Sequence, residues 1–111
     1  SIHHFPYLKK LSIQGVNLKD LSLVMQLEEL EELELNYSEI NSMDGIEYLT
    51  NLKKIKLYHA KIENIDKIKE LKSLEVVDLC ASEVKDIDIL KKLPNLKNLM
   101  IRPDSLERIL Y

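Results

Sequence analysis

A cysteine, a histidine and an aspartate are spaced along the chain in a way that suggests a nucleophilic site. Asp78 and Cys80 are separated by one residue, and His59 comes earlier in the chain. In such a trio the imidazole deprotonates the thiol and the carboxylate orients the ring. A nucleophile also needs an organised pocket with oxyanion donors, and the sequence has no glycine loop that could supply one. We therefore expect no catalytic residue and no enzyme activity.

Metal and cofactor chemistry has equally little support in the sequence. His3 and His4 are adjacent, but two imidazoles without further ligands are a weak metal signal. Gly15 and Gly45 are the only glycines, and neither belongs to a phosphate-binding loop. We expect no metal site and no cofactor.

Composition and charge describe one small domain of mixed charge. The 111 residues are 45% hydrophobic and 32% charged, which suits a single domain over residues 1–111. Lys and Arg number 16 against 19 Asp and Glu, and the two signs alternate along the chain, so we expect no nucleic-acid partner. No apolar run approaches the roughly 20 residues that span a bilayer, so we expect no membrane partner.

Cysteine usage gives a prediction about the cellular compartment. Cys80 is the only cysteine, so the chain cannot form an internal disulfide. This favours a reducing, cytoplasmic compartment. A secreted or surface protein whose signal peptide has been removed stays open as the alternative.

A repeat of fixed length runs through the sequence. A leucine recurs every 22 residues, and we number it position 1 of each repeat: Leu8, Leu30, Leu52, Leu74 and Leu96. Positions 4, 6, 11, 14, 17 and 20 are also apolar wherever the chain contains them. Such self-similarity is typical of a solenoid, in which each unit buries its apolar face against its neighbours. The predicted repeats are 8–29, 30–51, 52–73 and 74–95, with partial repeats 1–7 and 96–111.

The spacing within a repeat predicts its secondary structure. The two-residue step from position 4 to position 6 indicates a short strand, and the three-residue steps from position 11 to position 20 indicate a helical return arm. Side-chain oxygens at position 15 are expected to mark the start of that arm and to cap it; these belong to Ser22, Asp44, Asp66 and Asp88. The predicted fold class is an α/β solenoid.

The pattern L-x-x-L-x-L followed by I-x-x-I-x-x-I-x-x-L resembles the leucine-rich repeat family over essentially the whole chain. The resemblance is to the 22-residue subclass of bacterial internalins and of a regulatory subunit of protein phosphatase 1. It implies a right-handed horseshoe with about five parallel strands on the concave face and short helical turns on the convex face. The family usually has asparagine at position 9, whereas this chain has Val16, Ser38, Ala60, Ser82 and Asp104.

The resemblance also implies that positions 3, 5 and 7 face the concave side, which we call the wall. At position 5, Glu34, Lys56 and Asp78 come from successive repeats, so the sign of the charge alternates. One interpretation is a set of cross-strand pairs worth ~0.2–1 kcal/mol each. The other is a charged stripe that recognises a partner of mixed charge, and the two are compatible.

An aromatic cluster is predicted where the strands leave the wall, an edge that we call the rim. Tyr37, Tyr58 and His59 occupy positions 7 and 8 of adjacent repeats. Tyrosine is enriched in binding hot spots, although aromatic side chains also simply cover loops. The predicted partner-binding residues are Tyr37, Tyr58, His59, Glu34, Lys56, Asp78, Met100 and Arg102.

These features favour non-catalytic recognition of another protein by a rigid scaffold. The resemblance implies the same, although this fold class binds unrelated partners. The alternative is a structural or oligomerising segment of a larger regulatory protein. The repeats begin and end part-way, which leaves three interpretations: a piece of a longer array, self-association through uncapped ends, or short tails that cover the ends.

Overall fold

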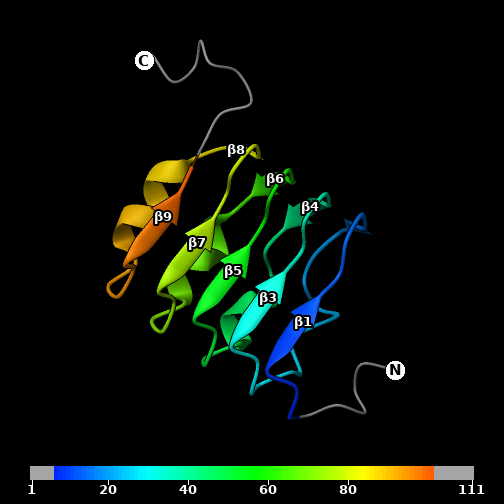
Figure 1. Ribbon diagram of the computed structural model, residues 1–111, viewed down its shortest axis with the longest axis vertical. Helices are drawn as coiled ribbons and strands as arrows, with labels where there is room; N and C mark the ends of the chain where they lie inside the picture. The colour runs from blue at the N-terminus through cyan, green and yellow to red at the C-terminus, as the bar shows by residue number, and fades with distance from the viewer. Residues whose placement is uncertain (1–6, 102–111) are drawn as a thin grey trace.

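The computed structural model describes residues 7–101 and shows a stack of repeats built on two parallel sheets (Figure 1). The first sheet has the order β1-β3-β5-β7-β9, and the second has the order β2-β4-β6-β8. The strands of the first sheet are β1 (Lys10–Ser12), β3 (Glu32–Glu34), β5 (Lys54–Lys56), β7 (Val76–Asp78) and β9 (Asn98–Met100). Those of the second are β2 (Asn17–Leu18), β4 (Glu39–Ser42), β6 (Lys61–Asn64) and β8 (Glu83–Val84).

The register of the first sheet follows the sequence repeat. Leu11 pairs with Leu33, Leu33 with Ile55, and Ile55 with Val77. Each residue therefore lies beside the residue that occupies the same repeat position in the next strand. Adjacent strands are ~4.8 Å apart, which brings equivalent side chains into contact along the stack. The predicted α/β solenoid fold is therefore confirmed.

The core consists of the aliphatic columns that define the repeat. Leu33, Leu35, Ile55 and Leu57 are fully buried, and each such side chain stabilises the fold by ~1.5–3 kcal/mol. At the edge of the first sheet Leu99 is 41% exposed, because β9 has a neighbouring strand on one side only among the described residues.

The three-residue spacing of the return arm has a direct structural cause. Among residues 7–101 three short 3-10 helices form there: η2 (Ile46–Tyr48), η3 (Asp66–Glu70) and η4 (Ile87–Lys92). Ile46 N–H donates to the Met43 carbonyl at 3.0 Å, and Leu49 N–H donates to the Ile46 carbonyl at 2.9 Å. A 3-10 helix has three residues per turn, so residues three apart share one face. The side chains that carry the spacing are buried, except that Ile87 at the start of η4 is partly buried.

Position 11 is not part of the helical return arm, so its inclusion in that arm is wrong, whereas the helices begin near position 15, where the start was expected. Position 11 lies in the second sheet, where Leu18 pairs with Ile40, and Ile40 pairs with Ile62. Ile40 and Ile62 are buried between polar neighbours, which is the alternation of a strand with one buried face. The helical part of each return arm is confined to the positions after position 11.

The predicted helix caps at position 15 are also wrong. None of the three 3-10 helices has a side-chain cap hydrogen bond at its N-terminus. Instead the position-15 amides donate to side chains two residues earlier, at 3.0 Å from Ser22 to Asp20 Oδ1 and at 2.9 Å from Asp66 to Asn64 Oδ1. The hydrogen bond from the Ser22 amide lowers the pKa of the Asp20 carboxyl group. The polar residues here close turns rather than cap helices.

Serines at position 9 link neighbouring repeats in place of the asparagines of the family pattern. The Ser38 hydroxyl accepts a hydrogen bond from Val16 N–H at 3.2 Å and donates to the Asn36 carbonyl at 3.3 Å. Ser82 accepts from Ala60 N–H at 2.9 Å in the same way. Every second repeat therefore supplies a hydroxyl that satisfies the backbone of the repeat before it.

Candidate binding surface

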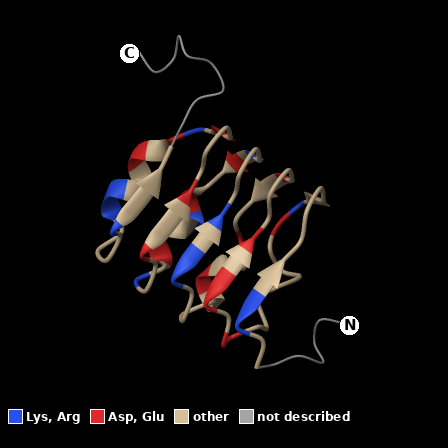
Figure 2. Ribbon diagram, viewed as in Figure 1, with Lys and Arg blue, Asp and Glu red and all other residues tan. Residues whose placement is uncertain are grey.

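The charged columns of the wall lie in register across the first sheet. At position 3, Lys10 pairs with Glu32, and Glu32 pairs with Lys54. At position 5, Glu34 pairs with Lys56, and Lys56 pairs with Asp78. Figure 2 shows the consequence, with basic segments in β1 and β5 and acidic segments in β3 and β7.

The ion pairs of the wall are unevenly distributed. Lys10 Nζ lies 3.7 Å from Glu32 Oε2 and 3.4 Å from Glu34 Oε1, and the Ser12 hydroxyl lies 3.3 Å from Glu34 Oε2. Glu32 and Glu34 lie beside Lys54 and Lys56 of the next repeat, as the repeat predicts. Their ion-pair partner, however, is Lys10 of the repeat before.

The lysines of β5 are not engaged in the same way. Within residues 7–101, neither Lys54 nor Lys56 has a carboxylate oxygen within 4.0 Å of its ammonium nitrogen. The neighbouring Asp78 carboxylate accepts the Cys80 N–H at 3.0 Å. Both lysines are half-buried on the wall. Their charges are therefore available to an approaching partner.

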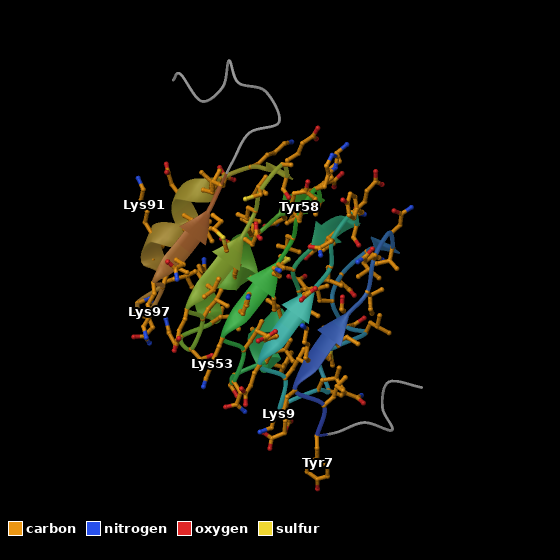
Figure 3. All side chains as sticks on the ribbon, viewed as in Figure 1. Tyr7, Lys9, Lys53, Tyr58, Lys91 and Lys97 are labelled. Carbon is orange, nitrogen blue, oxygen red and sulfur yellow. The ribbon has the colours of Figure 1, made fainter. Side chains whose placement is uncertain are left out.

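The structure brings the three rings of the rim together. The Tyr37 and His59 rings stack, with centroids 5.4 Å apart and an angle of 22° between planes. Tyr58 packs its edge against both rings, at 5.5 Å from Tyr37 and 6.0 Å from His59. Tyr37 stays 54% exposed and Tyr58 38%. Figure 3 shows Lys53 and Tyr58 at opposite ends of β5. We call Tyr37, Tyr58 and His59 the rim cluster.

The rim cluster stands on an unusual backbone. Position 8 has a positive φ in four successive repeats: Gly15 (67°), Tyr37 (59°), His59 (55°) and Ala81 (59°). The amide of position 8 donates to the carbonyl of position 7 in the next repeat, as from Tyr37 to Tyr58 at 2.9 Å. Sequence reasoning missed this conformation, and Gly15 was the one signal for it.

Ala81 allows the strain at position 8 to be measured. For an L-residue other than glycine the left-handed conformation costs ~1–2 kcal/mol. We expect Ala81→Gly to raise the free energy of unfolding by about 1 kcal/mol in urea denaturation. Ala60→Gly is the matched control, because Ala60 is buried without a positive φ, and it should instead destabilise the fold. Equal losses from both substitutions would contradict strain at position 8.

Met100 and Arg102 were predicted further along the wall. Met100 lies in β9, pairs in register with Asp78 and is 38% exposed. It is therefore two strands away from Lys56 and outside the rim cluster. Arg102 lies outside the described residues.

The cysteine, histidine and aspartate considered above lie in adjacent repeats. His59 and Cys80 are joined through the backbone, from His59 N–H to the Cys80 carbonyl at 2.9 Å. The His59 ring stacks on Tyr37, and Asp78 accepts the Cys80 amide. A hollow of about 600 Å³ opens elsewhere, between residues of β6, β8 and the end of the first sheet. Its lining contains none of the three residues.

Residues 7–101 lack two further features. In that range no group of three or more His, Cys, Asp and Glu side chains is placed to hold a metal ion. No helix there has the length and apolar character to cross a membrane.

Comparison with known proteins identifies the fold. No protein-family model matches the chain, and no curated protein sequence does. Among solved structures, an internalin (inlF) from Listeria monocytogenes matches with a TM-score of 0.73 over 97% of this chain at 22% identity. An internalin C2 (inlC2) from the same organism matches with a TM-score of 0.76 over 94% of this chain, also at 22% identity. The chain has the leucine-rich repeat fold.

The leucine-rich repeat likeness covers only part of each internalin. The chain spans 33% of the inlF chain and 48% of the inlC2 chain. At this identity the likeness concerns the leucine-rich repeat fold, so the function has to be argued from the wall and the rim.

Proposed function

We propose that the chain is a non-catalytic module that recognises another protein through its wall and rim. The observation that carries the proposal is the rim cluster: Tyr37 and His59 are both held at positive φ and both remain accessible. Bulky residues in this conformation cost stability and are concentrated at functional sites. Gly15 occupies the same position of another repeat without that cost.

Rigidity is the mechanism of the proposed recognition. The wall residues stand on strands whose inward side chains, such as Leu33 and Ile55, are fully buried. The rim is fixed by backbone hydrogen bonds between repeats. A preformed surface loses little ordering entropy on association, so more of the contact energy is available for affinity.

A second candidate is a structural or oligomerising segment of a larger regulatory protein. It is favoured by β9, which has one neighbouring strand among residues 7–101, with Leu99 41% exposed and Ile101, just after the strand, 48% exposed. Under this proposal association would depend on the ends of the sheet and not on the wall. Wall substitutions would then leave association unchanged.

The test compares captured proteins from wild-type chain, Tyr37→Ala/Tyr58→Ala and Tyr48→Ala. Tyr48 is the matched control, because it is 56% exposed like Tyr37 but belongs to η2, behind the first sheet (Figure 1). We expect a partner that the wild type and Tyr48→Ala retain and the rim variant loses, with its dissociation constant raised at least about tenfold. Equal recovery by all three chains would remove the rim from the proposal.

A further inference from the structure

The charges of the wall form a series with a definite symmetry. From β1 to β7 the strands carry basic, acidic, basic and acidic side chains, as Figure 2 shows. The column just before these strands repeats the series with Lys9, Glu31, Lys53 and Glu75, and it continues with Lys97 before β9, whose own strand residues carry no charge. Residues 30–51 contain six acidic and no basic side chains, whereas residues 52–73 contain seven lysines and three acidic side chains. The contrast is sharpest between β3 and β5.

The charges of the four strands β1, β3, β5 and β7 alternate, so the same four strands in reverse order carry the opposite charges. A two-fold axis that runs parallel to the strands, between β3 and β5, would place a second wall face to face with the first in this reverse order. That operation places β3 of one copy over β5 of the other, and β1 over β7. Glu32 then faces Lys54, and Glu34 faces Lys56. Every charged strand meets a strand of opposite sign.

The same axis brings the aromatic residues of the two copies together. The operation preserves the position along the strand, so position 8 of the second repeat faces position 8 of the third. Tyr37 of one copy therefore faces His59 of the other, and Asn36 faces Tyr58. The two rim clusters therefore meet on the axis, at the edge of the facing walls where the strands end.

We propose that the wall binds a second copy of this chain, wall to wall, about this two-fold axis. This inference rests on the proposed function, in which the wall binds a protein, and it identifies that protein as a second copy of the chain. A two-fold interface uses the same patch on both copies, with each residue pair occurring twice. Lys54 and Lys56, which have no ion-pair partner among the described residues, gain Glu32 and Glu34 of the facing copy.

The acidic partners differ in exposure, at 41% for the Glu32 side chain and 17% for the Glu34 side chain. Within residues 7–101 their ion-pair partner is Lys10, at 3.4–3.7 Å, and the Ser12 hydroxyl lies 3.3 Å from Glu34 Oε2. Charge complementarity of this kind speeds association and fixes the relative orientation of the two copies. It also makes association sensitive to salt. Dimerisation should therefore weaken as ionic strength rises to about 1 M, where the screening length is about 3 Å.

Sedimentation equilibrium on charge-reversed chains tests the proposal. Wild type should sediment at twice its mass of 13.0 kDa. Glu32→Lys/Glu34→Lys and Lys54→Glu/Lys56→Glu should each raise the dimer dissociation constant at least about tenfold, because like charges then face each other. An equimolar mixture of the two variants should form a mixed dimer, since the lysines of one face the glutamates of the other.

The chain carrying all four substitutions guards against misfolding of the paired variants. Its β3 is basic and its β5 acidic, so under the same axis it should dimerise as wild type does. Circular dichroism melting reports whether each chain is folded. Wild type that stays monomeric at low salt would overturn the proposal, and so would a folded four-site variant that is monomeric. A monomer that still captures a different protein through the rim would leave the proposed function standing.

Discussion

Gly45→Ala is expected to lower the free energy of unfolding by at least about 3 kcal/mol. A Cβ at Gly45 would lie 2.8 Å from both the carbonyl carbon and the carbonyl oxygen of Leu21. The φ of 107° is one that side-chain-bearing residues rarely adopt. Neither backbone can move freely, because Leu21 N–H donates to the Asp44 carbonyl at 2.8 Å. Urea denaturation gives the measurement.

Gly15→Ala is the matched control for Gly45. Gly15 also has a positive φ, of 67°, but nothing lies within 4 Å of an added Cβ. Its cost is that of the left-handed conformation alone, about 1–2 kcal/mol. If the two alanine substitutions cost the same, the close packing of Gly45 on the preceding repeat is not real.

Leu57→Ala is expected to cost between about 2 and 5 kcal/mol. Leu57 is fully buried at position 6, and its amide donates to the Asp78 carbonyl of the next repeat at 2.8 Å. Truncation leaves a cavity between repeats that are linked mainly to their nearest neighbours. The loss of stability should appear in thermal unfolding as well as in urea.

Lys56→Ala, at the last residue of β5 and directly before Leu57, provides the comparison. The Lys56 side chain faces the wall and has no ion pair among residues 7–101, so its removal should change stability by no more than about 0.5 kcal/mol. Similar losses from Leu57→Ala and Lys56→Ala would mean that the strand does not divide a core from a wall.

The sequence was sufficient to predict the strands of the first sheet and the solenoid fold. Aliphatic residues at positions 4 and 6 determine which side of each strand is buried, and a repeat without insertions determines the register. Leu33, Ile55 and Val77 therefore align as the repeat predicts. The repeat boundaries that reach into residues 1–6 and 102–111 stay predictions, as does the cytoplasmic location.

The second sheet and the 3-10 helices could not be separated from the aliphatic pattern alone. A three-residue step suits any helical arm, and position 11 belongs to that series although Ile40 lies in a strand. What distinguishes the two is the exposure of its neighbours, Glu39 and Asn41. Polar residues at position 15 suggested caps because the turn two residues earlier was not recognised.

The rim cluster was predicted from repeat positions, but its backbone was not. Aliphatic columns carry no information on φ, so the strain at Tyr37 and His59 emerges only from the structure. The ion pairs of the wall also depend on side-chain conformations, and Lys10 engages both glutamates. Partner binding by the eight predicted residues stays a prediction.

Hydroxyl-radical footprinting of the tyrosines is the most direct test of recognition through the wall and rim. Free chain at low concentration should be modified about equally at Tyr37 and Tyr48, which are 54% and 56% exposed. When the chain is bound to the protein it captures, a second copy included, we expect Tyr37 and Tyr58 to become protected while Tyr48 stays reactive. Protection of Tyr48 with unchanged modification of Tyr37 and Tyr58 would contradict the account.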